Sequence, residues 1–292
     1  MAERNAKLIL MVGVLGVSAS AILVRFSQAP SGVTAAYRLG WTVLLLLPVV
    51  LLRCRAELRR VTARDLVLCG ASGVLLALHF LTWFESLKRT SVASSTVLVS
   101  TEVIFTALGF ALFLHGKIPR LGVWAILLAF GGSALLALSG DGGAGELSGN
   151  LLALAAASAA AVYTLIGRIQ RGHLSTTVYT FLTYLACFLT LLLGTAAAGT
   201  PLTGYGGREW LIGLALAVLC TLLGHSLFSW CLKYLSPSYV SAAKLCEPVF
   251  SSLAAIPLFG EVPGPLQLAG GAAVLGAVLL YTWAEREKTP AG

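Results

Sequence analysis

The chain has 292 residues, of which 58% are hydrophobic and only 11% are charged, and its mean hydropathy is +0.89. Soluble domains carry about 25% charged residues, so this composition excludes a water-soluble globule. The net charge of +8 comes from Lys and Arg scattered through short connectors, which indicates membrane topology and no nucleic-acid partner. The six Cys form no CxxC pair, so neither a disulfide framework nor a metal site is predicted.

Apolar runs long enough to cross a bilayer follow one another along the whole chain. A helix crossing about 30 Å of hydrocarbon needs about 20 mostly apolar residues. On that basis the runs are separated by breaks at 28–31, 53–65, 88–90, 115–119, 140–147, 171–173, 200–208, 234–237 and 260–264. The first run follows Arg4 and Lys7 and resembles a secretory signal, but the nine later runs favour a retained helix. The sequence therefore predicts an all-α polytopic membrane protein with ten transmembrane helices.

The basic residues orient this bundle. If the N-terminus is cytoplasmic, the connectors on that side hold 14 of the 20 Lys and Arg, the opposite connectors hold 3, and 3 lie within spans. Cytoplasmic connectors carry the excess of Lys and Arg. Both termini are therefore expected in the cytoplasm. Since no organelle presequence is visible, a bacterial cytoplasmic membrane is the simplest location.

The two halves of the chain resemble each other. A shift of 145 residues places Ser86-Leu87-Lys88 over Cys231-Leu232-Lys233 and Glu102 over Glu247. We expect two five-helix repeats, at 8–139 and 148–284. Because five crossings are an odd number, the second repeat is inverted relative to the first, an arrangement that transporters use to place a substrate site near mid-membrane.

Several short motifs carry a family resemblance over nearly the whole chain. They are Ala36-Tyr37-Arg38-Leu39-Gly40, the stretch from Ser86 to Ser95, Glu247-Pro248-Val249-Phe250 and Leu258-Phe259-Gly260-Glu261. In order and spacing the chain resembles the EamA-type members of the drug/metabolite transporter superfamily. The first half departs from that pattern, with Val103 in place of a frequent Pro and His115-Gly116-Lys117 in place of the usual Gly-Glu. The resemblance implies a secondary transporter, often an exporter of amino acids or related metabolites, working by alternating access.

Charged residues inside the spans are the first candidates for a substrate site, since a charge at the bilayer centre costs on the order of 3 kcal/mol. They are Arg38, Glu102, Lys244 and Glu247. Lys244 and Glu247 share one helix face, and Pro248 leaves the Lys244 carbonyl without an amide donor and favours a kink. One interpretation is an ion pair that rearranges when substrate or a proton binds, and the other is a structural salt bridge. Arg38 and Pro248 are assigned structural roles.

Aromatic and imidazole side chains form a second group of candidates. His79 and Trp83 lie in the third span and His225 and Trp230 in the eighth, at corresponding places in the two repeats. They are expected to line a cavity for a planar or cationic ligand, although an interfacial Trp belt and helix-to-helix His hydrogen bonds remain the alternative. Tyr163 and Tyr179 add hydroxyl groups. Gly131 and Gly276 indicate close helix packing or a homodimer through spans five and ten.

The sequence favours a transporter over two other classes. No HExxH, GxSxG or P-loop motif is present, so neither an enzyme nor a nucleotide-driven pump is expected, and no cofactor is predicted. A non-transporting receptor for a small ligand is the remaining alternative. The inverted repeat discriminates against it, because two interconvertible halves have no evident use in a static binder. The expected partners are a small-molecule substrate and the lipid bilayer.

Overall fold

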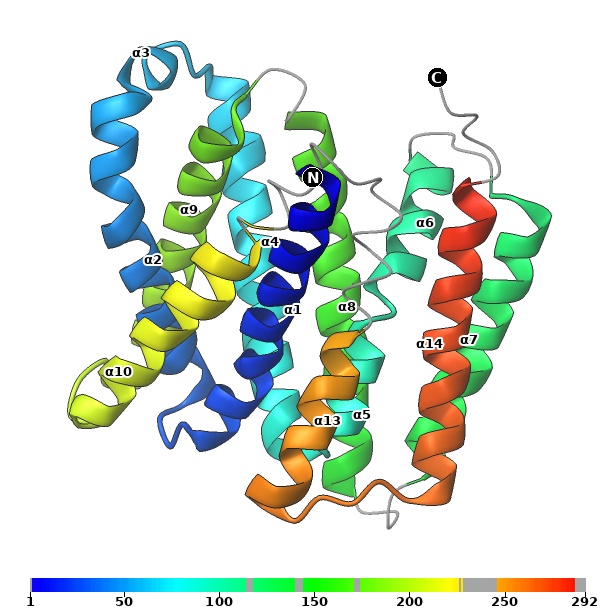
Figure 1. The fold of residues 1–292 in the computed structure, drawn as a ribbon. Helices are drawn as coiled ribbons and strands as arrows, with labels where there is room; N and C mark the ends of the chain where they lie inside the picture. The colour runs from blue at the N-terminus through cyan, green and yellow to red at the C-terminus, as the bar shows by residue number, and fades with distance from the viewer. Residues whose placement is uncertain are drawn as a thin grey trace.

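The computed structural model describes residues 2–113, 118–139, 144–170, 174–225, 227 and 246–286. Within these ranges every regular element is a helix, and the helices run up and down through one bundle (Figure 1). The elements are α1 Ala2–Phe26, α2 Ser31–Arg53, α3 Arg55–Leu58, α4 Ala63–Arg89, α5 Val92–Val99, α6 Glu102–Phe113, α7 Arg120–Leu138, α8 Ala144–Gln170, α9 Thr176–Ala197, α10 Gly207–Ala215, the π-helix η1 Leu216–His225, α13 Cys246–Phe259 and α14 Pro265–Arg286.

Each of the ten predicted spans contains helix within the residues that the structure describes. Eight stretches there are long and apolar enough to cross a membrane, and Arg120–Leu136 and Cys246–Phe259 are shorter apolar helices. The predicted all-α polytopic fold is therefore confirmed. Local chemistry sets several boundaries: Thr62 and Asp65 form a capping box at the start of α4, and Gly260, with φ of 69°, ends α13.

One boundary differs from the sequence prediction. Asp65 was expected in a solvated connector, but it lies in the first turn of α4 and is only 3% exposed. Its carboxylate accepts hydrogen bonds from the Thr62 backbone amide and hydroxyl, and from the Gln170 side chain at the end of α8. The Asp65 carboxylate can be buried because these donors together satisfy its hydrogen-bonding capacity.

The fourth span is interrupted at its centre. It consists of α5 and α6, which are separated by Ser100 and Thr101, whereas the sequence predicted one continuous helix. The Ser100 hydroxyl donates to the Thr96 carbonyl at 2.9 Å and the Thr101 hydroxyl to the Leu98 carbonyl at 2.6 Å. Hydroxyl groups that donate to backbone carbonyls compete with the backbone N–H groups that form the regular hydrogen bonds of a helix. The break leaves Glu102 as the first residue of α6.

Span eight changes its winding where it meets α1. Beyond α10 it continues as the π-helix η1, and such π segments often occur at functional sites. A Cβ on Gly16 would lie 2.7 Å from the Leu219 carbonyl oxygen, and a Cβ on Gly224 would lie 2.4 Å from the Val17 side chain. These glycines therefore let the backbones of α1 and η1 approach closely.

Helix packing relates the two halves of the chain to each other. Helix α4 of the first half packs on α8 of the second, and the corresponding pair is η1 with α1. Helices α5 and α6 also pack on α8, and the corresponding pair is α13 with α1. Helices α2 and α9 pack together, as do α7 and α14, which stand side by side at one edge of the bundle (Figure 1). Exchanging each span with the one five places away maps α4–α8 onto η1–α1 and α5/α6–α8 onto α13–α1, and it maps α2–α9 and α7–α14 each onto itself. The fold is thus a pair of inverted five-helix repeats whose first and third helices pack mainly across the two halves.

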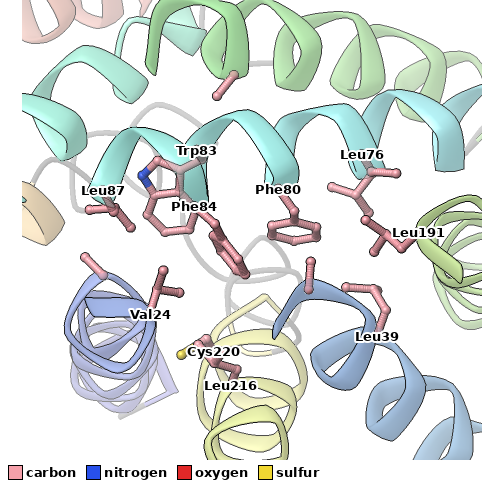
Figure 2. Close-up of a cluster of buried hydrophobic side chains, with 14 of the residues drawn as sticks. Val24, Leu39, Leu76, Phe80, Trp83, Phe84, Leu87, Leu191, Leu216 and Cys220 are labelled. Atoms are coloured by element: carbon pink, nitrogen blue, oxygen red, sulfur yellow. The ribbon is translucent and has the colours of Figure 1, made fainter. Parts of the chain in front are cut away.

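The largest buried cluster lies between the halves. Phe80, Trp83 and Phe84 of α4 project toward Val24 of α1 and Leu216 of η1 (Figure 2). All five side chains are at most 5% exposed. The cluster is therefore a dry contact between elements of the two repeats.

Candidate functional site

The candidate site lies at the break in span four. Glu102 is ten residues beyond Val92, or about 15 Å along the span at 1.5 Å per residue, roughly half of the hydrocarbon thickness. Its carboxylate accepts a hydrogen bond of 2.8 Å from the Thr164 hydroxyl of α8. A carboxylate at a helix start is also favoured by the positive end of the helix dipole. The geometry therefore holds an acidic group at mid-membrane between α6 and α8.

His79 of α4 contacts the same helix, α8, as Glu102 does. Its Nδ1 is 3.0 Å from the Ala156 carbonyl oxygen of α8, and its ring stacks with Trp83 at 5.8 Å between centroids. The Glu102 carboxylate acts electrostatically on both the His79 imidazole and the Tyr163 hydroxyl. The structure thus brings together three of the predicted residues, Glu102, His79 and Tyr163, and places Trp83 beside them.

Trp83 is buried and not part of an interfacial belt. It is 5% exposed and belongs to the cluster between the halves, and its indole N–H meets no acceptor among the described residues. Leaving a buried donor without an acceptor costs about 1–3 kcal/mol. The indole is accordingly available to an acceptor that enters this region.

Arg38 forms a second polar centre, on α2. Its side chain is 2% exposed, its Nε donates to the Thr221 hydroxyl of η1 at 3.0 Å, and one Nη donates to the Ser20 hydroxyl of α1 at 3.1 Å. The guanidinium also lies over the Phe80 ring at 4.4 Å from the centroid. Glu247 of α13 acts on this guanidinium electrostatically. Arg38 therefore ties α1, α2 and η1 together and faces an acidic residue of the second half.

The other predicted residues fall into three groups. Tyr179 is 3% exposed, and its hydroxyl pairs with Ser72 at 2.7 Å, which joins α9 to α4. Pro248 is buried in the first turn of α13. The side chains of His225, Trp230 and Lys244 lie outside the described residues, and so does the Lys244 carbonyl that Pro248 was expected to free.

The two glycines predicted to allow close helix packing, Gly131 and Gly276, are not the ones at the contact between α7 and α14. An added Cβ on Gly131 or on Gly276 would meet no atom of the described residues within 4 Å, so neither glycine is needed for a close contact within that part of the chain. The close approach of α7 and α14 falls on their neighbours: a Cβ on Gly132 would lie 2.9 Å from the Gly270 carbonyl oxygen. The packing role therefore belongs to Gly132 and Gly270, and the other two glycines face outward.

Sequence reasoning missed a group of polar contacts at the helix ends. Arg25, at the end of α1, forms an ion pair with Glu261, which follows α13. Glu209, at the start of α10, accepts hydrogen bonds from the Ser27 hydroxyl at 2.6 Å and from the Gln28 backbone amide at 3.0 Å. Charged residues at span ends were a visible signal, but their partners lie far away in sequence.

These features define a polytopic α-helical membrane protein with a polar site between two inverted repeats. Its sequence matches the model of the EamA-like transporter family twice, over residues 5–138 and 147–283. The chain belongs to the EamA-like transporter family, within the drug/metabolite transporter superfamily. It is a small-molecule transporter and not an enzyme, as the sequence predicted.

Several relatives carry names that state an activity. The chain is 24% identical over 207 residues to the pseudopaline exporter CntI of Pseudomonas aeruginosa strain UCBPP-PA14, covering 71% of this chain and 72% of that protein. It is 27% identical over 167 residues to the threonine/homoserine exporter RhtA of Escherichia coli K12, covering 57% and 56%. It is 28% identical over 233 residues to a probable terminal-alkyne amino-acid exporter of Streptantibioticus cattleyicolor, covering 76% and 75%.

A solved structure has the same fold. A crystal structure with 20% sequence identity superposes with a TM-score of 0.64 and covers 98% of this chain and 99% of its own. At this identity the likeness concerns the fold alone.

Proposed function

We propose that the protein is a secondary transporter that exports a small polar metabolite, an amino acid or a related compound, by alternating access. The observation that carries the proposal is the acidic Glu102, held by Thr164 at the break in span four with His79 within electrostatic range. An amino acid carries a cationic ammonium group, so it can present a charge to this carboxylate.

The names of the relatives support the same class of cargo, since they include exporters of amino acids and of pseudopaline. In this proposal Glu102 binds the ammonium group, and His79, Trp83 and Tyr163 line the cavity beside it. His225, Trp230, Lys244 and Glu247 supply the corresponding side of the second repeat. The Lys and Arg distribution supports cytoplasmic termini in this proposal, and a bacterial cytoplasmic membrane is proposed as the location.

Counterflow in proteoliposomes tests this function. The purified protein is reconstituted with a pool of unlabelled amino acids, amines or nucleobases inside, and uptake of a labelled member of the same class is followed. Saturable exchange of an amino-acid class is the expected result. Binding of that class without exchange, by protein shown to be folded, would replace the proposal with a non-transporting receptor.

A further inference from the structure

One cluster ties together four elements at the end of the bundle away from the N-terminus. Arg25 at the end of α1 donates one Nη to the Leu87 carbonyl of α4 at 2.6 Å and the other to the Glu261 carboxylate. The second Glu261 oxygen accepts a 2.8 Å hydrogen bond from the Val92 backbone amide, at the start of α5. The Arg25 guanidinium also lies 5.4 Å from the centroid of the Phe259 ring of α13.

The cluster is partly shielded from water. The side chains of Arg25 and Glu261 are 25% and 21% exposed, and the Phe26 and Phe259 rings pack beside them at 5.1 Å between centroids. Hydrogen bonds that involve charged groups are about twice as strong as neutral ones, and shielding strengthens them further. The cluster therefore joins α1 and α4 of the first repeat to the end of α13 in the second.

The repeat relation shows that the positions equivalent to this cluster at the opposite end carry other residue types. A shift of 145 residues takes Arg25 to Gln170, Glu261 to Gly116 and Val92 to Pro237. Gln170 carries no charge, Gly116 has no carboxylate, and Pro237 has no backbone N–H. All three interacting groups are therefore missing from the equivalent positions by residue type alone.

One other polar contact between the repeats has a counterpart at the opposite end. Asp65 at the start of α4 accepts from Gln170 at the end of α8, and Glu209 at the start of α10 accepts from Ser27 and Gln28 beyond the end of α1. These two contacts are equivalent under the exchange of repeats, and they lie at opposite ends of the bundle. They favour neither end, whereas the groups of the Arg25 cluster have no counterparts at the positions that the 145-residue shift makes equivalent.

We propose that Arg25, Glu261 and the Val92 amide form the gate that closes the extracellular end, and that this gate biases the resting carrier toward the state that opens to the cytoplasm. The inference rests on the proposed function and deepens it, because a carrier resting in that state takes its substrate from the cytoplasm. Opening the extracellular end requires the Arg25–Glu261 pair to separate, since the pair joins helices of the two halves.

The gate is tested by the reactivity of a buried cysteine. Ser251 lies two turns inside α13 and is 1% exposed. Ser251→Cys is placed in a full-length background without the native cysteines, and the rate of labelling by a membrane-impermeant maleimide is measured from outside in spheroplasts. Glu261→Gln and Arg25→Gln are each expected to raise that rate about tenfold, because each removes a charged hydrogen-bond partner. Equal rates with and without these substitutions would overturn the gate.

Two further variants separate gating from general damage. Val92→Pro removes the amide that donates to Glu261 and keeps both charges, at a first helical position where proline is well tolerated, and it should also speed labelling. Arg89→Gln is the control, because Arg89 pairs with Glu85 within α4 and should leave the rate unchanged. Faster labelling by Arg89→Gln as well, or no effect of Val92→Pro, would show that the cluster is not the gate.

This measurement does not depend on transport. If labelling behaves as expected and counterflow fails, the proposed transport function falls and the gate stands. If counterflow succeeds and labelling does not respond, the gate falls and the function stands.

Discussion

Arg38 is a buried charge and Glu102 a half-buried one, and the two are held in different ways. Glu102 accepts one hydrogen bond, from Thr164, whereas Arg38 donates to Thr221 and to Ser20 and also contacts the Phe80 ring. A charge with several fixed partners is a packing element, and a charge with few is available to a ligand or a proton. At the scale of single residues, Glu102 is therefore the better candidate for contact with cargo and Arg38 for structure.

Replacing Glu102 with Gln tests that assignment. The substitution keeps an oxygen that can accept from Thr164 but removes the charge and the site of protonation. We expect counterflow to fall at least about tenfold, since one lost charge interaction of about 1.4 kcal/mol corresponds to that factor. Glu247→Gln, at the equivalent position of the second repeat, should alter transport or its pH dependence. Wild-type flux with an unchanged pH profile in Glu102→Gln would remove Glu102 from the site.

Thr221→Val tests the structural role of Arg38. The substitution is nearly isosteric and leaves the Nε of a fully buried guanidinium without its acceptor, which costs about 1–3 kcal/mol. We expect a lower melting temperature for the protein in detergent. Thr180→Val is the control, because the Thr180 hydroxyl bonds only to carbonyls of its own helix. A melting temperature equal to that of the control would contradict a structural Arg38.

At the scale of helices, the contact of α7 with α14 depends on which face a glycine occupies. Gly132→Ala should destabilise the protein, because its Cβ would lie 2.9 Å from the Gly270 carbonyl oxygen and from the Ala273 Cβ. Gly131→Ala, one residue away, meets open space and should be neutral or stabilising, since alanine favours a helix by about 1 kcal/mol over glycine. The melting temperatures of the two variants test this difference. Equal destabilisation by both substitutions would contradict the packing of α7 against α14.

The helices were predictable from sequence, and their irregularities were not. Runs of apolar residues revealed the spans because lipid forces each segment to satisfy its own backbone hydrogen bonds. The break at Ser100 and Thr101 was missed because both residues also occur in regular helices, where residues such as Ser158 make similar side-chain bonds to carbonyls. Asp65 looked like a connector residue because its partner Gln170 lies 105 residues away.

The same limit applies to the candidate site. Glu102, His79 and Trp83 were found because polar or bulky residues stand out in an apolar span. The partner of Arg25 was not found, because Glu261 is 236 residues away and nothing local relates the two. Pairings over such distances depend on how the two halves pack.

At the scale of the whole molecule, α7 and α14 present exposed apolar side chains at one edge of the bundle, among them Trp124 and Trp283. We propose that copies of the chain form a homodimer along this edge, with Gly131 and Gly276 facing the partner. Gly131→Leu should then convert dimers to monomers in light scattering of the detergent-solubilised protein, with the melting temperature little changed. A wild-type protein that is already monomeric would rule the dimer out.

The contact of Arg38 with Thr221 also has a consequence for how the protein is made. The two residues are 183 positions apart, so at about 5–20 residues per second the acceptor is synthesised roughly 10–40 s after the arginine. During that time α2 is already in the bilayer with a cation that lacks one of its partners, and its long side chain must reach toward the headgroups. The first half of a nascent chain therefore holds a cation whose hydrogen bonds are not yet complete. Chains that stop before η1 should be the ones that membrane quality control removes.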